Sequence, residues 1–196
     1  MNTSQYINRN DIGKYSEKID RRCDRYDDSK DIEAFVSFMK FFQSSMGKNE
    51  TDAEWVSKPD GDYGVDLGVK KNGVLRYTFD LEMMVPWNKD WPRNYQHVSF
   101  LDRKVKFLKK PIPFIMVWIN KQRNKFICAD EETILKYPTK ECNVKGKIDK
   151  KKCLPFQDCR LHAYNTTLTE REKRIFPRHS ELCSLQTPKN LITYTG

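Results

Sequence analysis

Apolar residues recur at helical spacing near the start of the chain. Phe35, Met39 and Phe42 stand three or four positions apart, and Asp31 before them is a residue type that caps helices. An apolar stripe of this kind buries one side of a helix against a core and leaves the other side in water. The pattern therefore predicts an amphipathic helix over residues 31–47.

Strict alternation of apolar and polar residues follows, over residues 62–70 and again over residues 75–84. This period of two predicts two β-strands, each with one buried face. The odd-numbered positions are mostly apolar, whereas the even-numbered positions include Asp66, Asp80 and Glu82. If the two strands pair in a matching register, the three carboxylates share one face of the sheet.

The turn between these strands decides that register. The linking residues are Lys71-Asn72-Gly73, a strong hairpin signal. A two-residue Asn-Gly turn would set the apolar face of one strand beside the polar face of the other, so we favour a three-residue loop with Gly73 left-handed. That register pairs Asp66 with Thr78 and places Asp80 diagonally beside Asp66.

Strand-like and helix-like stretches alternate in the rest of the chain. Residues 111–120 hold a continuous apolar run that is typical of a buried central strand. Asp130 and Thr169 precede residues that favour helix starts, and residues 101–110 predict a basic helix. The pattern predicts an α/β fold with a mixed central β-sheet flanked by helices. Other expected features are strands over 95–100, 125–129 and 154–164, a short turn over 52–56 and a Lys-rich loop over 138–152.

Charge narrows the classes of partner. The chain has 36 Lys and Arg against 27 Asp and Glu, a formal net charge of +9. A basic surface attracts polyanions and releases their counterions, so nucleic acid is the expected partner. No apolar stretch approaches the roughly 20 residues of a membrane span, and the polar N-terminus lacks a signal-peptide core. We expect no membrane partner, a cytoplasmic location (the host cytoplasm if the source is viral) and reduced cysteines.

The acidic face suggests a metal site. Three carboxylates held together repel one another, and a divalent cation offsets that repulsion. Mg²⁺ prefers oxygen ligands, and such an ion supplies what phosphodiester hydrolysis needs. Asp66, Asp80 and Glu82 are therefore candidate ligands for Mg²⁺ (or Mn²⁺) and candidate catalytic residues. The alternative interpretation is that they are the solvated side of a sheet.

The order of these elements resembles the core of the PD-(D/E)XK, or restriction-endonuclease-like, nuclease superfamily. The matching motifs are Gly61-Asp62-Tyr63-Gly64-Val65-Asp66 and Phe79-Asp80-Leu81-Glu82. The segment from Trp87 through Trp91-Pro92 to Asp102-Arg103-Lys104 is similar to phage- and virus-encoded members. The resemblance implies a nuclease core over residues 31–136, between a polar segment, 1–30, and a C-terminal extension, 137–196, that packs on the core.

The resemblance also implies residue roles. Asp66 and Asp80 match the metal ligands, while Glu82 stands where the family usually has a lysine. Lys104 is a candidate to take over that lysine's role, which is to orient or activate the attacking water and to stabilise charge on the phosphate. Glu33 or Glu50 would complete the acidic set, and His97 is a further candidate ligand or base. Arg103, Lys104 and Lys106 are expected to contact nucleic acid.

Further basic, aromatic and sulfur-bearing residues leave alternatives open. The Lys/Arg sets of 103–110 and 145–152, with Arg171, Lys173, Arg174 and Arg178, are candidate backbone contacts or solvated faces. Trp87 and Trp91 either stack on bases or, as we favour, pack in the core. The spacing of Cys142, Cys153, Cys159 and His162 matches no common zinc motif, so zinc is not expected.

Together these features favour a Mg²⁺-dependent endonuclease acting on DNA, with branched DNA such as a Holliday junction as a candidate substrate. Small members of the fold are often dimers, so a homodimer is a candidate assembly. The main alternative is a catalytically inactive module on the same fold that holds nucleic acid or a protein partner. The glutamate at position 82 in place of lysine motivates that alternative.

Overall fold

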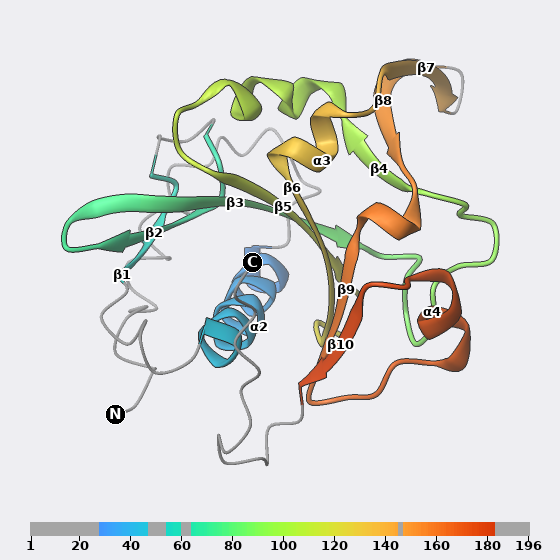
Figure 1. The fold of residues 1–196 in the computed structure, drawn as a ribbon, viewed down its shortest axis with the longest axis horizontal. Helices are drawn as coiled ribbons and strands as arrows, with labels where there is room; N and C mark the ends of the chain where they lie inside the picture. Colours follow the sequence, from blue (N-terminus) through green and yellow to red (C-terminus); the bar gives the residue numbers. More distant parts are fainter. Residues whose placement is uncertain (1–27, 47–53, 60–63, 145–146, 183–196) are drawn as a thin grey trace.

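The computed structural model describes residues 28–46, 54–59, 64–144 and 147–182, which form a large mixed sheet, a small sheet and short helices (Figure 1). The large sheet has seven strands in the order β1-β2-β3-β5-β6-β9-β10, and the small sheet has the order β4-β8-β7. The elements, in chain order, are α2 (Asp28–Met46), β1 (Glu54–Ser57), β2 (Leu67–Lys71), β3 (Val74–Met84), β4 (Val98–Leu101), the 3₁₀ helix η3 (Asp102–Lys109), β5 (Phe114–Asn120), β6 (Lys125–Asp130), α3 (Glu131–Leu135), β7 (Thr139–Val144), β8 (Lys147–Leu154), the 3₁₀ helix η4 (Phe156–Asp158), β9 (Arg160–Tyr164), α4 (Glu170–Ile175) and β10 (His179–Leu182).

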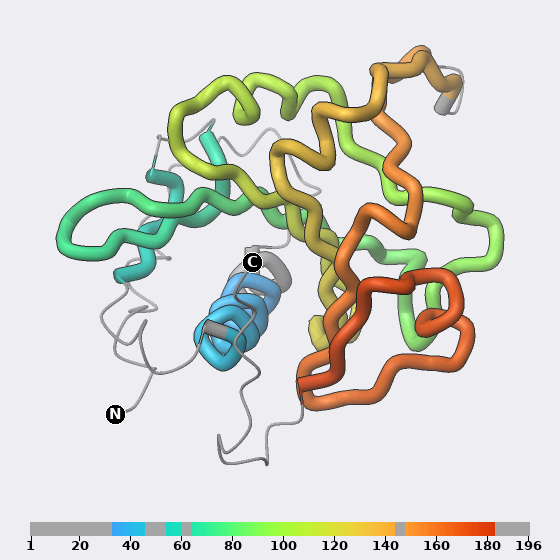
Figure 2. Tube along the Cα trace, viewed as in Figure 1, coloured from blue at the N-terminus to red at the C-terminus, as the bar shows by residue number. Residues whose placement is uncertain are grey.

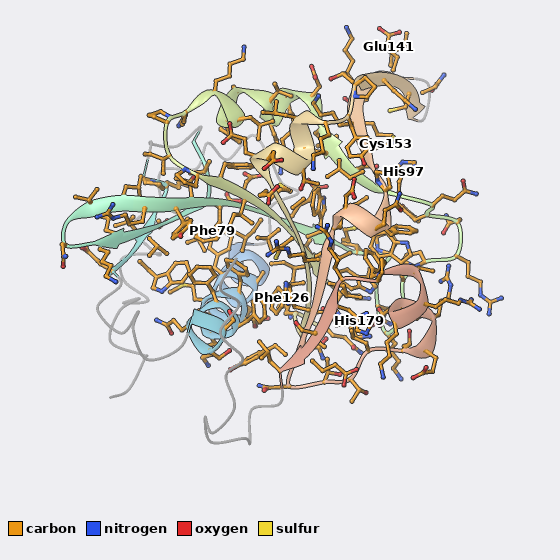
Figure 3. All side chains as sticks on the ribbon, in the orientation of Figure 1. Phe79, His97, Phe126, Glu141, Cys153 and His179 are labelled. Atoms are coloured by element: carbon orange, nitrogen blue, oxygen red, sulfur yellow. The ribbon has the colours of Figure 1, made fainter. Side chains whose placement is uncertain are left out.

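Helix α2 covers one face of the large sheet, as its apolar stripe predicts. Phe38 lies 5.2 Å from the ring of Phe79, and Phe41 stacks on Phe126 at 4.8 Å. Figure 3 shows Phe79 and Phe126 on the side of the sheet that α2 covers. Burying an aromatic ring of this size contributes about 1.5–3 kcal/mol. We call this cluster, which also contains Trp55, Leu67, Val117 and Ile119, the α2-side core.

The opposite face of the large sheet carries a second core, beneath the small sheet, η3, α3 and α4. We call it the small-sheet-side core; its members include Val98, Phe100, Met116, Trp118, Ile134, Leu154 and Phe176. Strand β5 lies between the two cores and is buried along most of its length, so the prediction of a buried central strand over 111–120 is confirmed. Strand β3 is parallel to β5 but antiparallel to β2, and the sheet is therefore mixed, as predicted.

The prediction of a three-residue loop between the two strands is wrong. Asn72 and Gly73 form a two-residue turn with φ of 53° and 74°, and Lys71 pairs with Val74. Two left-handed residues in succession match the twist of the flanking strands. The mismatch of faces that this turn creates is removed by a β-bulge in β3, after which Gly68, not Asp66, pairs with Thr78. Beyond the bulge, even-numbered positions face even-numbered ones.

Two segments predicted to lack regular structure form strands. Residues expected to form a turn over 52–56 include β1, which pairs antiparallel with β2. The expected Lys-rich loop over 138–152 is largely the β7–β8 hairpin. The small sheet buries only part of this hairpin and leaves most of the rest in water. Lysines therefore replace the apolar residues whose alternation would have indicated a strand. Lysines are common on such exposed edges, where they discourage pairing with other chains.

The C-terminal part of the chain belongs to the large sheet. Strand β9 pairs antiparallel with β6, and β10 pairs parallel with β9. The trace in Figure 2 shows this orange and red segment running along the yellow strands of the preceding region. Strands β9 and β10 therefore belong to the same sheet as β1, β2, β3, β5 and β6, whereas β7 and β8 join β4 in the small sheet.

Candidate active site

Strand β3 presents Asp80 and Glu82 on the face opposite α2. Phe79 is buried in the α2-side core, so strand alternation turns Asp80 and Glu82 to the other side. Their partners on β5, Met116 and Trp118, belong to the small-sheet-side core. Asp80 is 5% exposed, whereas Glu82 is partly exposed. A buried carboxylate is costly unless a positive group or hydrogen-bond donors accompany it.

Lys104 supplies that positive group. It lies on η3, and its Nζ donates hydrogen bonds to Asp80 Oδ2 and, at 3.2 Å, to Glu82 Oε2. Burial opposes the charged form of Lys104, but the carboxylates of Asp80 and Glu82 outweigh it and raise the pKa of the lysine above its usual value. The structure therefore brings together three predicted site residues, and the ammonium links both carboxylates.

Asp66 lies next to this group at the edge of β3. It occupies a bend before β2, and its Oδ2 accepts a hydrogen bond of 2.8 Å from the backbone N–H of Leu81, the residue between Asp80 and Glu82. Beyond Phe79, β3 has no further strand partner on the β2 side among the described residues. The Asp66 carboxylate thus accepts a hydrogen bond from the backbone N–H of Leu81, which lies beyond the part of β3 that pairs with β2. This bond holds Asp66 beside the stretch of β3 that carries Asp80 and Glu82.

The donor set suits a hard, oxygen-binding cation. Within the described ranges, no group of three or more His, Cys, Asp and Glu lies close enough to hold a metal ion. Mg²⁺ does not require such a cage, because it keeps several waters and commonly binds through one or two carboxylates together with substrate phosphates. Asp80 and Glu82, with Asp66 beside them, fit that type of site.

Other candidates for the acidic centre lie elsewhere or outside the described residues. Glu33 pairs with Arg123 at 2.8 Å, and its helix covers the opposite face of the sheet from Asp80. His97 directly precedes β4, and burial, followed by the nearby Lys151 and Lys140, lowers its pKa. Its charged neighbours are therefore lysines of the small sheet. Glu50 lies outside the described residues.

The two tryptophans are core residues, as favoured from the sequence. Trp87 and Trp91 are fully buried, and their rings meet edge to face with centroids 5.4 Å apart. Stacking on a base needs an exposed ring, so that interpretation is wrong for both residues.

The cysteines and His162 do not converge. Cys159 is buried in the small-sheet-side core, whereas His162 contacts the Phe41 ring on the α2 side, with centroids 5.1 Å apart. His162 Nδ1 lies 2.6 Å from Ser180 Oγ, and Cys142 Sγ bonds to Asp149 O at 3.4 Å. The two sides of β9 thus separate the members of the zinc alternative.

The predicted nucleic-acid contacts divide into exposed and internally paired residues. Arg103 and Lys106 are exposed on η3, and Lys106 Nζ lies 5.0 Å from the centroid of the Phe107 ring. Arg171 donates to Trp91 O, and Lys173 pairs with Glu170 and Glu181, both at 3.3 Å. Arg103 and Lys106 are thus accessible to a ligand, as are the exposed Arg174 and Arg178.

A second charged pair, between Lys125 and Glu172, was not predicted. Lys125 Nζ lies 2.5 Å from Glu172 Oε2, and Trp87 Nε1 donates to Glu172 Oε1 at 2.8 Å. Glu172 also closes a capping box with Thr169, which is the one sequence signal that pointed to it. The pair anchors the loop after β3, because Lys125 Nζ also donates to Lys89 O at 2.6 Å.

Of the helices within the described ranges, none combines the length and the apolar character that a membrane span requires. No protein-family model matches the chain, and no curated protein is significantly similar to it.

Proposed function

We propose that this protein is a Mg²⁺-dependent nuclease that hydrolyses phosphodiester bonds in DNA at the centre formed by Asp66, Asp80, Glu82 and Lys104. The observation that carries the proposal is the contact of one lysine with two carboxylates on a single strand, with a third acid held at the intervening residue. This arrangement supports the PD-(D/E)XK resemblance in one respect: Lys104, from another element, is in reach of the position where Glu82 replaces the usual lysine.

In this proposal Asp80 and Glu82 would hold Mg²⁺, assisted by Asp66. When bound, the ion would polarise a phosphoryl oxygen and lower the pKa of a coordinated water. Lys104 has three N–H donors, of which two serve Asp80 and Glu82. The third would donate to a non-bridging phosphate oxygen or to the attacking water, where the ammonium charge would stabilise the negative charge on the phosphoryl oxygens.

The overall reaction balances without another reagent. The oxygen of water forms a bond to phosphorus, and the bond from phosphorus to the leaving oxygen breaks. One proton of the water ends on the leaving oxygen, which gives a hydroxyl end and a phosphomonoester end. Asp66, Asp80 and Glu82 are the nearest described acceptors to pass that proton.

Branched DNA with two-fold symmetry would call for two copies of the chain.

The experiment is a cleavage assay on linear duplex, four-way branched and single-stranded DNA with Mg²⁺, Mn²⁺ or a chelator. We expect metal-dependent cleavage by the wild type and a loss of on the order of 10²–10³-fold in Asp80→Asn and Glu82→Gln, the usual cost of removing a group that stabilises transition-state charge. The matched controls are Asp149→Asn and Glu132→Gln, which change exposed acids away from the site and should leave cleavage intact.

Two outcomes would reject the proposal. Equal cleavage by the wild type and Asp80→Asn would show that the activity does not arise at this centre. Salt-dependent DNA binding without cleavage by the wild type would favour the second candidate, an inactive binding module. The specific observation behind that candidate is Lys104 itself, whose ammonium already contacts both carboxylates and offsets one of their two negative charges.

A further inference from the structure

Helix η3 is a 3₁₀ helix, and this geometry sorts its side chains by threes. A 3₁₀ helix has three residues per turn, so positions three apart lie directly above one another. Arg103, Lys106 and Lys109 are exposed and form one such row. The other two rows turn inward, one with Lys104 and buried Phe107 and the other with Val105 and buried Leu108.

The exposed row has a regular spacing. With a rise of about 2.0 Å per residue, successive members stand about 6 Å apart along the helix. Neighbouring phosphates along a nucleic-acid strand repeat on a comparable scale. An α-helix would rotate the same three residues progressively around its axis, so the matched row exists because this helix is 3₁₀.

The helix that carries the row has four cations and one acid. The only acid in the helix, Asp102, accepts a hydrogen bond of 2.7 Å from Thr139 Oγ1 at the start of β7. Directly beyond that contact, Lys140 and Lys151 are paired across β7 and β8. Like charges facing each other across strands destabilise a sheet, and an anion nearby relieves the repulsion. The lowered pKa of His97, caused by burial and then by these two lysines, agrees with a positive potential here.

The row is tied directly to the candidate active site. Lys104, which contacts Asp80 and Glu82, follows Arg103 in the same helix. A polyanion held on the outer row would therefore lie against the same helix whose inward side carries Lys104.

We propose that Arg103, Lys106 and Lys109 bind three successive phosphates of one nucleic-acid strand and thereby guide that strand past Lys104. This rests on the proposed function for the identity of the substrate but concerns how it is held. It also defines the substrate class: a polymer with several consecutive phosphates binds, whereas a mononucleotide engages only one of the three cations. The sequence prediction named Arg103 and Lys106 and left Lys109 among the candidates of 103–110, from which the 3₁₀ row selects it.

The test measures binding without chemistry. Association of a fluorescein-labelled single-stranded DNA is followed by anisotropy at several salt concentrations, with a chelator present and in the Asp80→Asn background. The triple variant Arg103→Gln/Lys106→Gln/Lys109→Gln is compared with Lys40→Gln/Lys121→Gln/Lys136→Gln. The control removes the same number of charges from exposed positions on α2, the β5–β6 turn and the end of α3.

Counterion release sets the expected result. Each phosphate contact contributes about 0.7 to the slope of log association constant against log salt for a single strand, so the η3 triple should reduce the slope by about 2. The control triple should leave the slope unchanged. All three η3 side chains are exposed, and circular dichroism checks that each variant is folded; if the triple unfolds, single variants should each reduce the slope by about 0.7.

Several outcomes would overturn the proposal. Equal slopes in the η3 triple and the wild type would show that the row makes no phosphate contacts. An equal reduction in both triples would mean that only net charge matters, and a reduction confined to Lys140→Gln/Lys151→Gln would mean that the strand follows the hairpin. The test measures only the salt dependence of DNA binding. An unchanged slope in the η3 triple would therefore reject the phosphate row without deciding whether the protein cleaves DNA.

Discussion

Two lysine–carboxylate groups of this molecule differ in how much water reaches them. The side chains of Lys125 and Glu172 are 3% and 0% exposed, whereas those of Lys104, Asp80 and Glu82 are 14%, 7% and 36% exposed. Glu172 is closed in by Trp87, Thr169 and Lys125. At the other group, Glu82 keeps a third of its surface in solvent.

The difference separates a structural ion pair from a site that can bind a ligand. The closed pair uses its hydrogen-bonding capacity to anchor a loop, and a buried pair of this kind withstands its desolvation cost only when nearly every donor and acceptor is matched. The open group places the carboxylates of Asp80 and Glu82 and the ammonium of Lys104 within reach of a molecule arriving from solvent. Perturbed, partly exposed charges in such a setting are typical of functional sites.

The largest expected effect comes from breaking the closed pair. Glu172→Gln leaves Lys125 buried with no carboxylate, and removing one partner of a buried ion pair costs about 3–5 kcal/mol. Urea denaturation followed by circular dichroism measures the free energy of unfolding. Glu170→Gln, on the exposed side of the same helix, should change it by less than about 0.5 kcal/mol. A loss below about 1 kcal/mol in Glu172→Gln would show that water reaches the pair.

A second test asks whether the burial of His162 makes the free energy of unfolding depend on pH. Burial beside α2, and then Arg160, lower the pKa of His162 from 6.5 to about 4. The unfolded chain therefore binds more protons between these values, so the free energy of unfolding falls as pH drops from 6.5 towards 4. At about 1.4 kcal/mol per pKa unit, the loss is on the order of 3 kcal/mol.

The measurement is urea denaturation at several pH values through that window. His162→Gln should flatten the dependence, whereas His179→Gln, at an exposed position on β10, should leave it as steep as in the wild type. An unchanged slope in His162→Gln would assign the acid sensitivity to other groups.

The smallest expected effect probes the open group without chemistry. Mg²⁺ and the ammonium of Lys104 compete for the Asp80 and Glu82 carboxylates, so Lys104→Met should bind Mg²⁺ about tenfold more tightly, or about 1.4 kcal/mol. The rise in melting temperature with added MgCl₂ reports this affinity, because a ligand that binds only the folded state stabilises it. Lys106→Met is the matched control. No response to Mg²⁺ in either the wild type or Lys104→Met would exclude these carboxylates as the metal site.

Short sequence patterns predicted much of the fold. The apolar repeat of Phe35, Met39 and Phe42 predicted α2, and the alternation around Phe79 predicted β3 with its acidic face. The capping residues Asp130 and Thr169 predicted α3 and α4. Each of these signals acts within a few residues of the chain, where periodicity and caps depend on the backbone's own geometry. The alternating pattern therefore determined that Asp80 and Glu82 would lie on one face of a strand.

Contacts between distant segments were decided only by the tertiary structure. The bulge in β3 restored a register that the Asn72-Gly73 turn alone would have broken. Lys104 reaches Asp80 only because η3 packs over β3, and Glu172 meets Trp87 across 85 positions of sequence. Such pairings have no local signature, since the energy that selects them comes from burying shared surfaces and matching charges that only the folded chain brings together.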